Sequence, residues 1–471
     1  MPRVASLVAV TLIAVATRAW AAEPTPAPAT ALRPSVVLVT VDTLRADALG
    51  CYGAGAGATP NLDRVAAEGA QFLNAACPMP HTRPSHFSIL TGLYPRDHGV
   101  VNNLIALPEQ ATTLAEVLSD AGYASAAFVG AVHLNRASGA AQGFDELSAP
   151  AEPATWTADQ VVSRALAWLR NAANQQRPFL LWIHLFDPHL PYAPPAAFRP
   201  PSPAGALSEV SWPILLDVAR QHGGDVPGAV RDRARALYQG EARFVDHEIG
   251  RVIELLREHD RLDRTILAVT ADHGECFDHG VFFDHSDCLY DGAIQVPLLV
   301  RYPPAVASAQ RLGGQVELRR LPATILRLAG IAAPPPFEPE TLFEQAADPH
   351  AMAFVERAFY PAGSAERRDQ RLTTIRTVGG EPIRPLDPEQ DWVGVRTSAW
   401  KYLRMGERRE LYDLTADPRE RANVSAERPA IRDPLDAALT TWLGAHPIRV
   451  LDAGQINERL RESLEALGYT H

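Results

Sequence analysis

Residues 35–42 of the chain read SVVLVTVD, a run of β-branched and apolar residues that ends in an acid. Such a run predicts a strand buried on both faces, the kind found in the middle of a parallel sheet. A second run, TILAVTAD at residues 265–272, ends in the same way. We therefore expect Asp42 and Asp272 to lie at the carboxyl edge of one sheet, where open α/β folds bind their ligands.

Helix-like and strand-like stretches alternate along the chain between and around these two runs. This alternation predicts the α/β class, with a mainly parallel sheet sandwiched by helices in a catalytic domain of residues 35–365. Short strands and a helix then predict a small C-terminal α+β subdomain, residues 366–471. The expected helices are 112–122, 159–173, 229–258 and one near 433–446, and the expected strands are 124–130, 178–186, 296–303 and a group within 391–414.

The first 21 residues have the pattern of a signal peptide: Arg3, an apolar stretch, and small residues at Ala19 and Ala21. Residues 22–34 form a Pro/Ala linker. We expect a protein that is secreted or periplasmic after cleavage. A membrane anchor is the alternative, but the apolar stretch is short for a spanning helix, and no later segment is long and apolar enough to form a stable span.

Charge limits the class of partner. The chain has 44 basic and 55 acidic residues, a formal charge of −11, which argues against nucleic acid. Its one lysine is Lys401, so an anion must be bound by arginine, histidine or metal. Four cysteines, Cys51, Cys77, Cys276 and Cys288, allow three pairings, and unpaired cysteines are an equal alternative.

The acids that end the two strands form a candidate metal site together with His273, which follows Asp272. Two neighbouring carboxylates repel each other unless a proton or cation lies between them. A nitrogen ligand favours zinc or manganese, although calcium stays open. The alternative is that each aspartate caps a helix or turn. A second metal held by Asp187, His189 or His285 is a further hypothesis.

Residues 80–95, PHTRPSHFSILTGLYP, place a hydroxyl and an imidazole at the start of a helix-like run. Threonine followed by proline is common helix punctuation, so capping alone would explain Thr82. The rest of the chain favours a chemical role for Thr82 and His86.

Several motifs, in order, resemble the sulfatase family of the alkaline phosphatase superfamily. VTVDTLRADALGCYG and TPNLDRVAAEGAQFLNA resemble the family's opening, and TRPSHFSILTGLYPRDHGV its nucleophile signature. LAVTADHGE and LYDGAIQVPLLVRYP resemble its second metal-binding segment, and ELYDLTADPRERANVS its closing sheet. The resemblance covers nearly the whole chain after residue 34.

The resemblance implies roles for individual residues. Asp42, Asp272, His273 and Thr82 would hold one divalent metal ion. Thr82 falls where the family has the cysteine or serine that becomes formylglycine. His86 replaces the arginine of that signature, and we expect this catalytic residue to orient Thr82, bind the anion or supply the arginine's charge.

Other histidines match the family's substrate-contacting positions. His189 and His285 are the candidate acid/base residues, and His285 falls near a sulfate-binding lysine. His133, beside Ala131 at the other lysine position, and His184 are the candidate substrate-binding residues. His184 lies inside an apolar strand, a position that indicates burial.

The departures from the family all concern the reacting group. Thr43 replaces an acid of the usual pair, and threonine cannot be oxidised to an aldehyde, so no formylglycine is expected. Threonine can attack directly, because a metal and a helix N-terminus both favour its charged form. A phosphorylated threonine is released more readily than a sulfated one, which favours phosphate esters or phosphonates, whereas family membership favours sulfate.

The leading hypothesis is an exported, metal-dependent hydrolase of sulfate- or phosphate-type esters on a small molecule, glycan or lipid, with Thr82 as nucleophile. A phosphoryl-group transferase to a glycan or lipid acceptor is one alternative. A non-catalytic binding protein on a degenerate sulfatase fold is the other.

Overall fold

The structure is a computed structural model that describes residues 33–151, 154–173, 177–201, 203, 205–358, 374–384 and 391–448. From Pro34 onward the described residues belong to one compact unit. The predicted signal peptide, most of the linker and the predicted boundary between residues 365 and 366 lie outside the described residues.

The predicted mainly parallel sheet is confirmed. β1 is buried along its whole length between β5 and β7, which both run parallel to it. Antiparallel pairing occurs at β10 and β11, so the expected strand 296–303 runs against its neighbours. Among the described residues the sheet has the order β10 (Gln295–Val296), β2 (Ala70–Ala76), β11 (Leu298–Arg301), β7 (Thr265–Ala271), β1 (Ser35–Val41), β5 (Phe179–Leu185), β3 (Ala124–Val129) and β4 (Glu146–Ser148), with β12 (Gln310–Glu317) beside β2.

The register of this sheet brings the two strand-end acids together. Val41 of β1 pairs with Ala271 of β7, so Asp42 and Asp272 follow adjacent residues at the same edge. On the other side of β1, Thr40 pairs with His184 of β5. This edge therefore collects side chains from three neighbouring strands.

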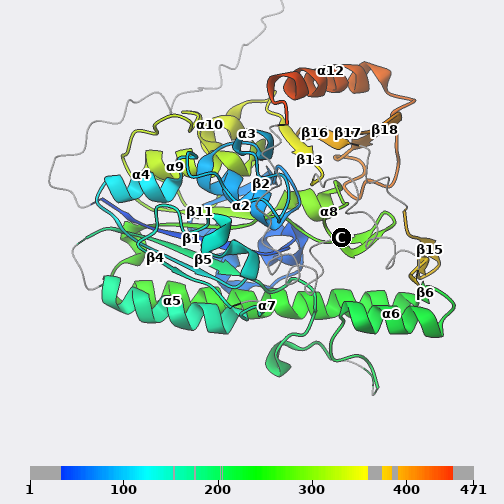
Figure 1. Ribbon diagram of the computed structural model, residues 1–471, viewed down its shortest axis with the longest axis horizontal. Helices are drawn as coiled ribbons and strands as arrows, with labels where there is room; N and C mark the ends of the chain where they lie inside the picture. The colour runs from blue at the N-terminus through cyan, green and yellow to red at the C-terminus, as the bar shows by residue number, and fades with distance from the viewer. Residues whose placement is uncertain are drawn as a thin grey trace, which may run out of the picture. The chain divides into compact units, whose positions relative to one another are not determined.

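Helices cover both faces of the sheet (Figure 1). α5 packs on β3 and β5, and α7 packs against α5 on that same face. α2 and α4 lie on the opposite face, where a capping box of Thr113 and Glu116 begins α4. The helices of this part are α1 (Pro60–Glu68), α2 (Thr82–Thr91), α3 (Pro95–His98), α4 (Leu114–Asp120), α5 (Ala158–Ala173), α6 (Trp212–Gln221), α7 (Gly228–Glu258), α8 (Asp291–Ile294), α9 (Leu321–Leu328) and α10 (Leu342–Ala347).

The predicted C-terminal sheet and helix are confirmed. An antiparallel sheet has the order β13 (Ala353–Glu356), β16 (Trp392–Arg396), β17 (Trp400–Met405) and β18 (Arg408–Asp413). α12 (Pro429–Ala445) packs on it through Leu435, Leu439 and Trp442. β13 comes from the stretch expected to belong to the catalytic domain, so this sheet draws on both sides of the predicted boundary.

A buried ion-pair network fastens this C-terminal sheet to α8. Lys401 Nζ lies 2.8 Å from Asp291 Oδ1 and 2.5 Å from Glu420 Oε1, and the Lys401 side chain has no exposed surface. Arg396 Nη2 lies 2.8 Å from Asp291 Oδ2. The one lysine of the chain is thus used in packing, and it is not available to bind a substrate anion.

Two small sheets complete the described structure: β15 (Glu381–Pro382), β14 (Thr377–Val378) and β6 (Asp225–Val226), and the hairpin of β8 (Cys276–Asp278) and β9 (Val281–Asp284). A disulfide between Cys276 and Cys288 encloses the β8–β9 hairpin, while Cys51 and Cys77 are free thiols. The pairing that the sequence left open is therefore that of the two later cysteines.

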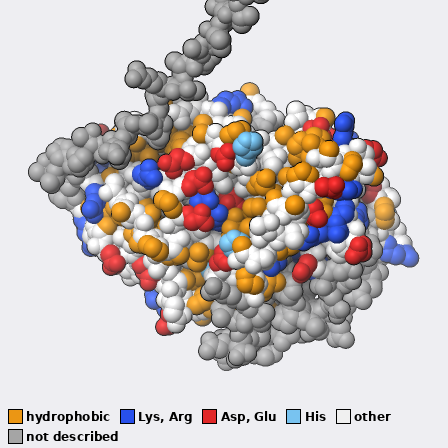
Figure 2. Space-filling model, turned by 90° about the horizontal axis from the view of Figure 1, so that it is seen from above, with side chains coloured by type: hydrophobic (Ala, Val, Ile, Leu, Met, Phe, Trp, Pro, Cys, Tyr) orange, Lys and Arg blue, Asp and Glu red, His pale blue; other side chains and the backbone are white. Residues whose placement is uncertain are grey.

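No helix within the described ranges has the length and apolar character needed to cross a membrane. Figure 2 shows one face of the molecule, on which acidic and basic side chains are interspersed with apolar ones.

Candidate active site

Thr82 is the first residue of α2, and its side chain is fully buried. His81 occupies the N-cap position, and the Thr82 hydroxyl has no hydrogen-bond partner in the described part of the chain. Capping therefore does not explain Thr82. One turn further on, Ser85 Oγ donates a hydrogen bond of 2.6 Å to the backbone carbonyl of Asp272, which fastens the start of α2 to the end of β7.

The Asp272 carboxylate has one satisfied and one unsatisfied oxygen. Oδ1 accepts hydrogen bonds from the backbone N–H groups of His273, at 2.8 Å, and Thr43, at 3.3 Å. Oδ2 is buried and receives no hydrogen bond from any described residue. Thr43 takes a positive φ of 53°, an uncommon conformation for a residue with a side chain, and this turn aims its N–H at the carboxylate.

His273 presents one nitrogen to both acids. Its Nδ1 lies 3.0 Å from the carbonyl of Gly274 and donates a proton to it, which leaves the lone pair on Nε2. Nε2 lies 3.4 Å from Asp272 Oδ2 and 3.7 Å from Asp42 Oδ1. A ring held in this way by a backbone carbonyl has the tautomer of a metal-ligating histidine.

Both carboxylate oxygens of Asp42 are buried and unpartnered among the described residues. Burial raises the pKa of Asp42 well above its ordinary value, and repulsion from Asp272 raises it further. Burying two such acids side by side is unfavourable unless a cation joins them. The set of Asp42, Asp272 and His273, whose ligand atoms lie within 4.8 Å of one another, therefore fits a divalent metal ion.

His86 lies one helical turn after Thr82 and uses both ring nitrogens. Nδ1 lies 2.8 Å from the Thr82 carbonyl, and Nε2 lies 3.0 Å from Thr40 Oγ1. Trp182 Nε1 donates to that same hydroxyl oxygen at 3.0 Å. Burial lowers the pKa of His86 to about 3, so the ring is neutral. Of the roles expected for His86, this environment favours orienting neighbours over carrying the missing arginine's charge.

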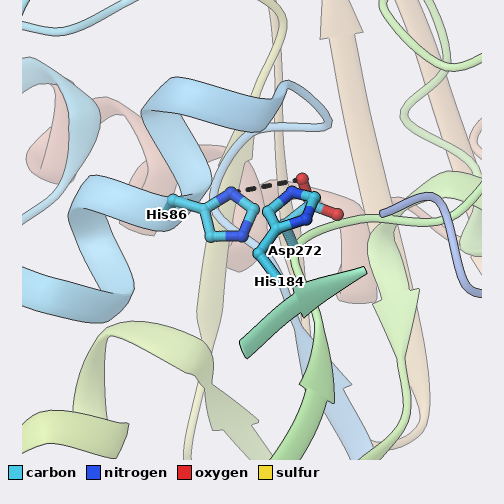
Figure 3. A group of neighbouring side chains, drawn as sticks. All are labelled: His86, His184 and Asp272. Carbon is cyan, nitrogen blue, oxygen red and sulfur yellow. Dashed lines mark ion pairs between the residues drawn. The ribbon is translucent and has the colours of Figure 1, made fainter. Parts of the chain in front are cut away.

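The two candidate substrate-binding histidines are both fully buried. His184 stacks on His86 with ring centroids 4.7 Å apart (Figure 3). His184 Nε2 lies 3.6 Å from Asp42 Oδ2. His133 lies near α2, where Arg83 Nε donates to its backbone carbonyl at 2.7 Å. Substrate contact by these residues stays a prediction.

The rings of the two candidate acid/base histidines meet edge to face, and one of them lies against the ring of His273. His189 and His285 have ring centroids 5.5 Å apart, and His285 lies 4.2 Å from the ring of His273. Each donates its Nδ1 proton to a backbone carbonyl, His189 to Leu190 at 2.6 Å and His285 to Pro80 at 2.9 Å. In this tautomer Nε2 carries the lone pair on both rings. Burial lowers the pKa of both, for His189 to about 3.

Asp187, expected as a ligand of a second metal, has a different partner. Its Oδ2 accepts a 2.7 Å hydrogen bond from the backbone N–H of Ala158, the first residue of α5. It belongs to neither group of residues that could hold a metal ion within the described ranges. The structure thus gives Asp187 a role in starting a helix.

Several polar residues of the site were not predicted. Ser85 and Thr40 orient α2 and His86, as described above. Glu275, two residues after His273, is buried, and Tyr192 donates to its Oε2 at 3.0 Å. Burial raises the pKa of Glu275 well above the ordinary value. All three lie inside sequence motifs that resemble the sulfatase family, so their position within a motif could have identified them as residues of the site. Nothing in the pattern of apolar residues distinguished them.

Comparison with known proteins defines the class. The sequence profile of the family described as "Sulfatase" matches residues 34–331, more than half of the chain. The chain belongs to the sulfatase family, and it is an ester hydrolase of that family. Members of the family usually bind a divalent metal ion.

Two relatives show how far this chain has diverged in sequence from proteins with a named activity. The chain is 23% identical over 486 residues to the N-acetylglucosamine-6-O-sulfatase of Bacteroides thetaiotaomicron, covering 83% of this chain and 82% of the relative. It is 27% identical over 379 residues to an arylsulfatase of Clostridium perfringens, covering 64% and 76%.

Two solved structures share the fold. One, in complex with its substrate D-glucosamine-2-N,6-O-disulfate, gives a TM-score of 0.69 at 21% identity and covers 88% of this chain and 98% of the other. The phosphonate monoester hydrolase of Agrobacterium radiobacter gives 0.67 at 20% identity and covers 88% and 96%. At this identity the likeness concerns the fold alone.

Proposed function

We propose that the chain is a metal-dependent hydrolase of phosphate- or sulfate-type esters, in which Thr82 attacks directly in place of formylglycine. The observation that carries this proposal is the Thr82 hydroxyl, which is buried at the start of α2 without a hydrogen-bond partner among the described residues. A buried polar group of this kind is costly unless a ligand or cation meets it. Ser85 ties this turn to Asp272.

Asp42, Asp272 and His273 would hold the metal ion, with Thr82 Oγ1 as a further oxygen ligand. When bound, a divalent cation supplies positive charge for the anionic ester and favours the deprotonated hydroxyl. Because one ligand is an imidazole nitrogen, zinc and manganese suit the site better than calcium.

The residues of the chain then divide the chemistry. Thr82 Oγ1 forms a bond to phosphorus or sulfur while the bond to the organic oxygen breaks. The neutral Nε2 of His189 or His285 takes the hydroxyl proton and passes it to the departing oxygen. Water then attacks the phosphorus or sulfur and gives a proton to Thr82 Oγ1, which releases phosphate, phosphonate or sulfate and restores the Thr82 hydroxyl.

Phosphate and phosphonate esters suit this nucleophile best. An aldehyde hydrate expels sulfate through its second hydroxyl, whereas threonine has no second hydroxyl and its ester must be released by water. Relatives support both classes of substrate, since they include sulfatases and phosphonate monoester hydrolases. The organic part of the ester is a small molecule, a glycan or a lipid.

We also propose that the protein works outside the cytoplasm, in the periplasm or as a secreted enzyme. Two features support this: the signal-peptide pattern of residues 1–21, and the Cys276–Cys288 disulfide, a bond that persists in oxidising compartments.

The test is turnover of matched aryl sulfate, phosphate monoester, phosphate diester and phosphonate monoester by protein loaded with zinc, manganese or calcium. We expect phosphoryl or phosphonyl turnover that falls at least about a thousandfold in Thr82→Ala and survives in Thr82→Ser. Thr91→Ala, which removes a hydroxyl at the far end of α2, is the control.

Absence of turnover with every ester and metal would refute the proposal. Turnover of aryl sulfate alone, unchanged in Thr82→Ala, would instead identify water as the attacking group.

A further inference from the structure

Beside the expected metal site lies a second group of side chains with the chemistry of metal ligands: His86, His184 and Asp272 (Figure 3). We propose that these residues, together with Asp42, hold a second divalent cation next to the first. The inference rests on the metal-dependent function proposed above, and it extends that function to a two-metal site.

The distances between ligand atoms carry the first step. His86 Nδ1 lies 3.4 Å from Asp272 Oδ2, and His184 Nε2 lies 3.6 Å from Asp42 Oδ2. Metal–ligand bonds of about 2.0–2.1 Å in a tetrahedral site separate the ligand atoms by about 3.4 Å. The same spacing occurs on the other side, where His273 Nε2 lies 3.4 Å from Asp272 Oδ2. The two acids thus stand between imidazoles on both sides.

The second step is the absence of any other partner in the described structure. Both nitrogens of His184 and both oxygens of Asp42 are buried without a hydrogen bond. The 3.6 Å between His184 Nε2 and Asp42 Oδ2 is too long for a hydrogen bond. Burying polar atoms such as these without a hydrogen-bond partner or a bound ion is energetically unfavourable. A cation between them would satisfy one nitrogen and one oxygen together.

The third step concerns His86, whose Nδ1 donates its proton to the Thr82 carbonyl while no cation is bound. To bind a cation, this nitrogen must offer its lone pair instead. This requires its proton to be on Nε2, which lies 3.0 Å from Thr40 Oγ1. A hydroxyl oxygen has two acceptor sites, so Thr40 can accept from both His86 Nε2 and Trp182 Nε1, which lies at 3.0 Å. The Thr82 carbonyl, 2.8 Å from His86 Nδ1, then becomes an additional oxygen ligand.

The arrangement assigns the two oxygens of Asp42 to different cations, Oδ1 toward His273 and Oδ2 toward His184. Paired divalent cations are a known means of stabilising the attacking and leaving oxygens in ester displacement. They would also supply positive charge to the site without a lysine, because the one lysine of the chain is ion-paired with Asp291 and Glu420.

The experiment counts metal ions in the purified protein. The protein is stripped with a chelator, reloaded with manganese, freed of excess metal and measured by elemental analysis and electron paramagnetic resonance. We expect two manganese ions per chain with a spin-coupled spectrum. His184→Ala and His86→Ala should each bind one ion and show the spectrum of an isolated ion.

Control variants separate this result from general damage. His273→Ala should also reduce the count to one, by removing the first site. His98→Gln changes a buried histidine outside both groups and should keep two ions and the coupled spectrum. Should His184→Ala fail to fold, as judged by its circular dichroism, His184→Gln and the wild-type spectrum decide the question.

The outcomes distinguish the two proposals. A wild-type count of one, without spin coupling, overturns the second site and leaves the proposed function standing. A count of zero overturns both. A count of two that persists in the His184 and His86 variants overturns the site argued here.

Discussion

Ser85 Oγ donates a 2.6 Å hydrogen bond to the backbone carbonyl of Asp272, and this contact joins the first turn of α2 to the end of β7. Thr82 lies on that turn, and Asp272 is one of the expected metal ligands. The proposed nucleophile and the expected metal site are thus connected by one buried hydrogen bond across 187 residues of sequence.

Removing this bond should impair turnover more than binding. We expect Ser85→Ala to lower kcat about tenfold with little change in KM, because small displacements of a nucleophile are costly. Stability should fall by about 1 kcal/mol. Thr91→Ala is the matched control, since its hydroxyl donates to Phe87 O within α2 and accepts from the N–H of Leu93 just past the helix. Steady-state kinetics that show an unchanged kcat in Ser85→Ala would argue against a positioning role.

Asp42→Asn should affect stability in opposite directions with and without metal. When a chelator keeps the protein free of metal, the variant should melt at a higher temperature than the wild type, because the substitution removes a buried carboxylate that repels Asp272. At about 100 times the dissociation constant, metal should stabilise the wild type by about 2.7 kcal/mol and the variant much less.

Asp246 provides the control for this melting experiment. It is a buried acid whose oxygens accept hydrogen bonds from the backbone of Asn61 and Leu62. Asp246→Asn should lower the melting temperature in both conditions and keep the response to metal. An Asp42→Asn protein that is destabilised in chelator would show that Asp42 has a stabilising partner other than a cation.

Loss of the Cys276–Cys288 disulfide should release the β8–β9 hairpin and disturb His285, which lies between Asp284 and Cys288. We expect Cys276→Ser to lower the free energy of unfolding by about 2–4 kcal/mol and to reduce turnover. Chemical denaturation and a thiol count check this. Cys51→Ser removes a free thiol outside the hairpin, and an equal effect in that variant would exclude a specific role for the disulfide.

Acid should destabilise the protein through its buried histidines, and His98 is a case outside the metal ligands. Val100 N–H donates to its Nδ1 at 3.1 Å, and burial lowers its pKa to about 3. An unfolded histidine titrates near about 6.5, so the unfolded state binds more protons below that pH. Stability is therefore lost as pH falls from about 6.5 towards 3, by up to about 1.4 kcal/mol per pH unit for one group.

His98→Gln should flatten this dependence. Urea unfolding of the metal-free wild type and variant between pH 7.5 and 4 measures the slope. Equal slopes for the two proteins would show that His98 does not contribute to acid sensitivity.

The sequence predicted the part of the fold that depends on long apolar runs. β1, β5 and β7 were recognisable because each is buried on both faces, and the acids that end β1 and β7 followed from the same pattern. β2 and β12 were missed, because AQFLNAA and QRLGGQVE carry small or polar residues that pair through the backbone. Their pairing depends on contacts distant in sequence.

Individual residues of the site could be predicted where they fall at a defined position of a sequence motif. The closeness of His184 to Asp42 was not, because it arises from the register of β5 against β1 and from the stacking of His86 on His184. No local pattern fixes such a register. The same holds for the disulfide, whose partners could not be chosen from spacing alone.

Lys401 carries the only side-chain amine of the chain, and that amine is enclosed between Asp291 and Glu420. Reagents that acylate or reductively methylate amines therefore meet no lysine on the native surface. Lys401 reacts only when β17 separates from α8 or the chain unfolds. The rate at which Lys401 is modified therefore reports the rate of that opening event. Mass spectrometry of the peptide that contains Lys401 measures it without an engineered label.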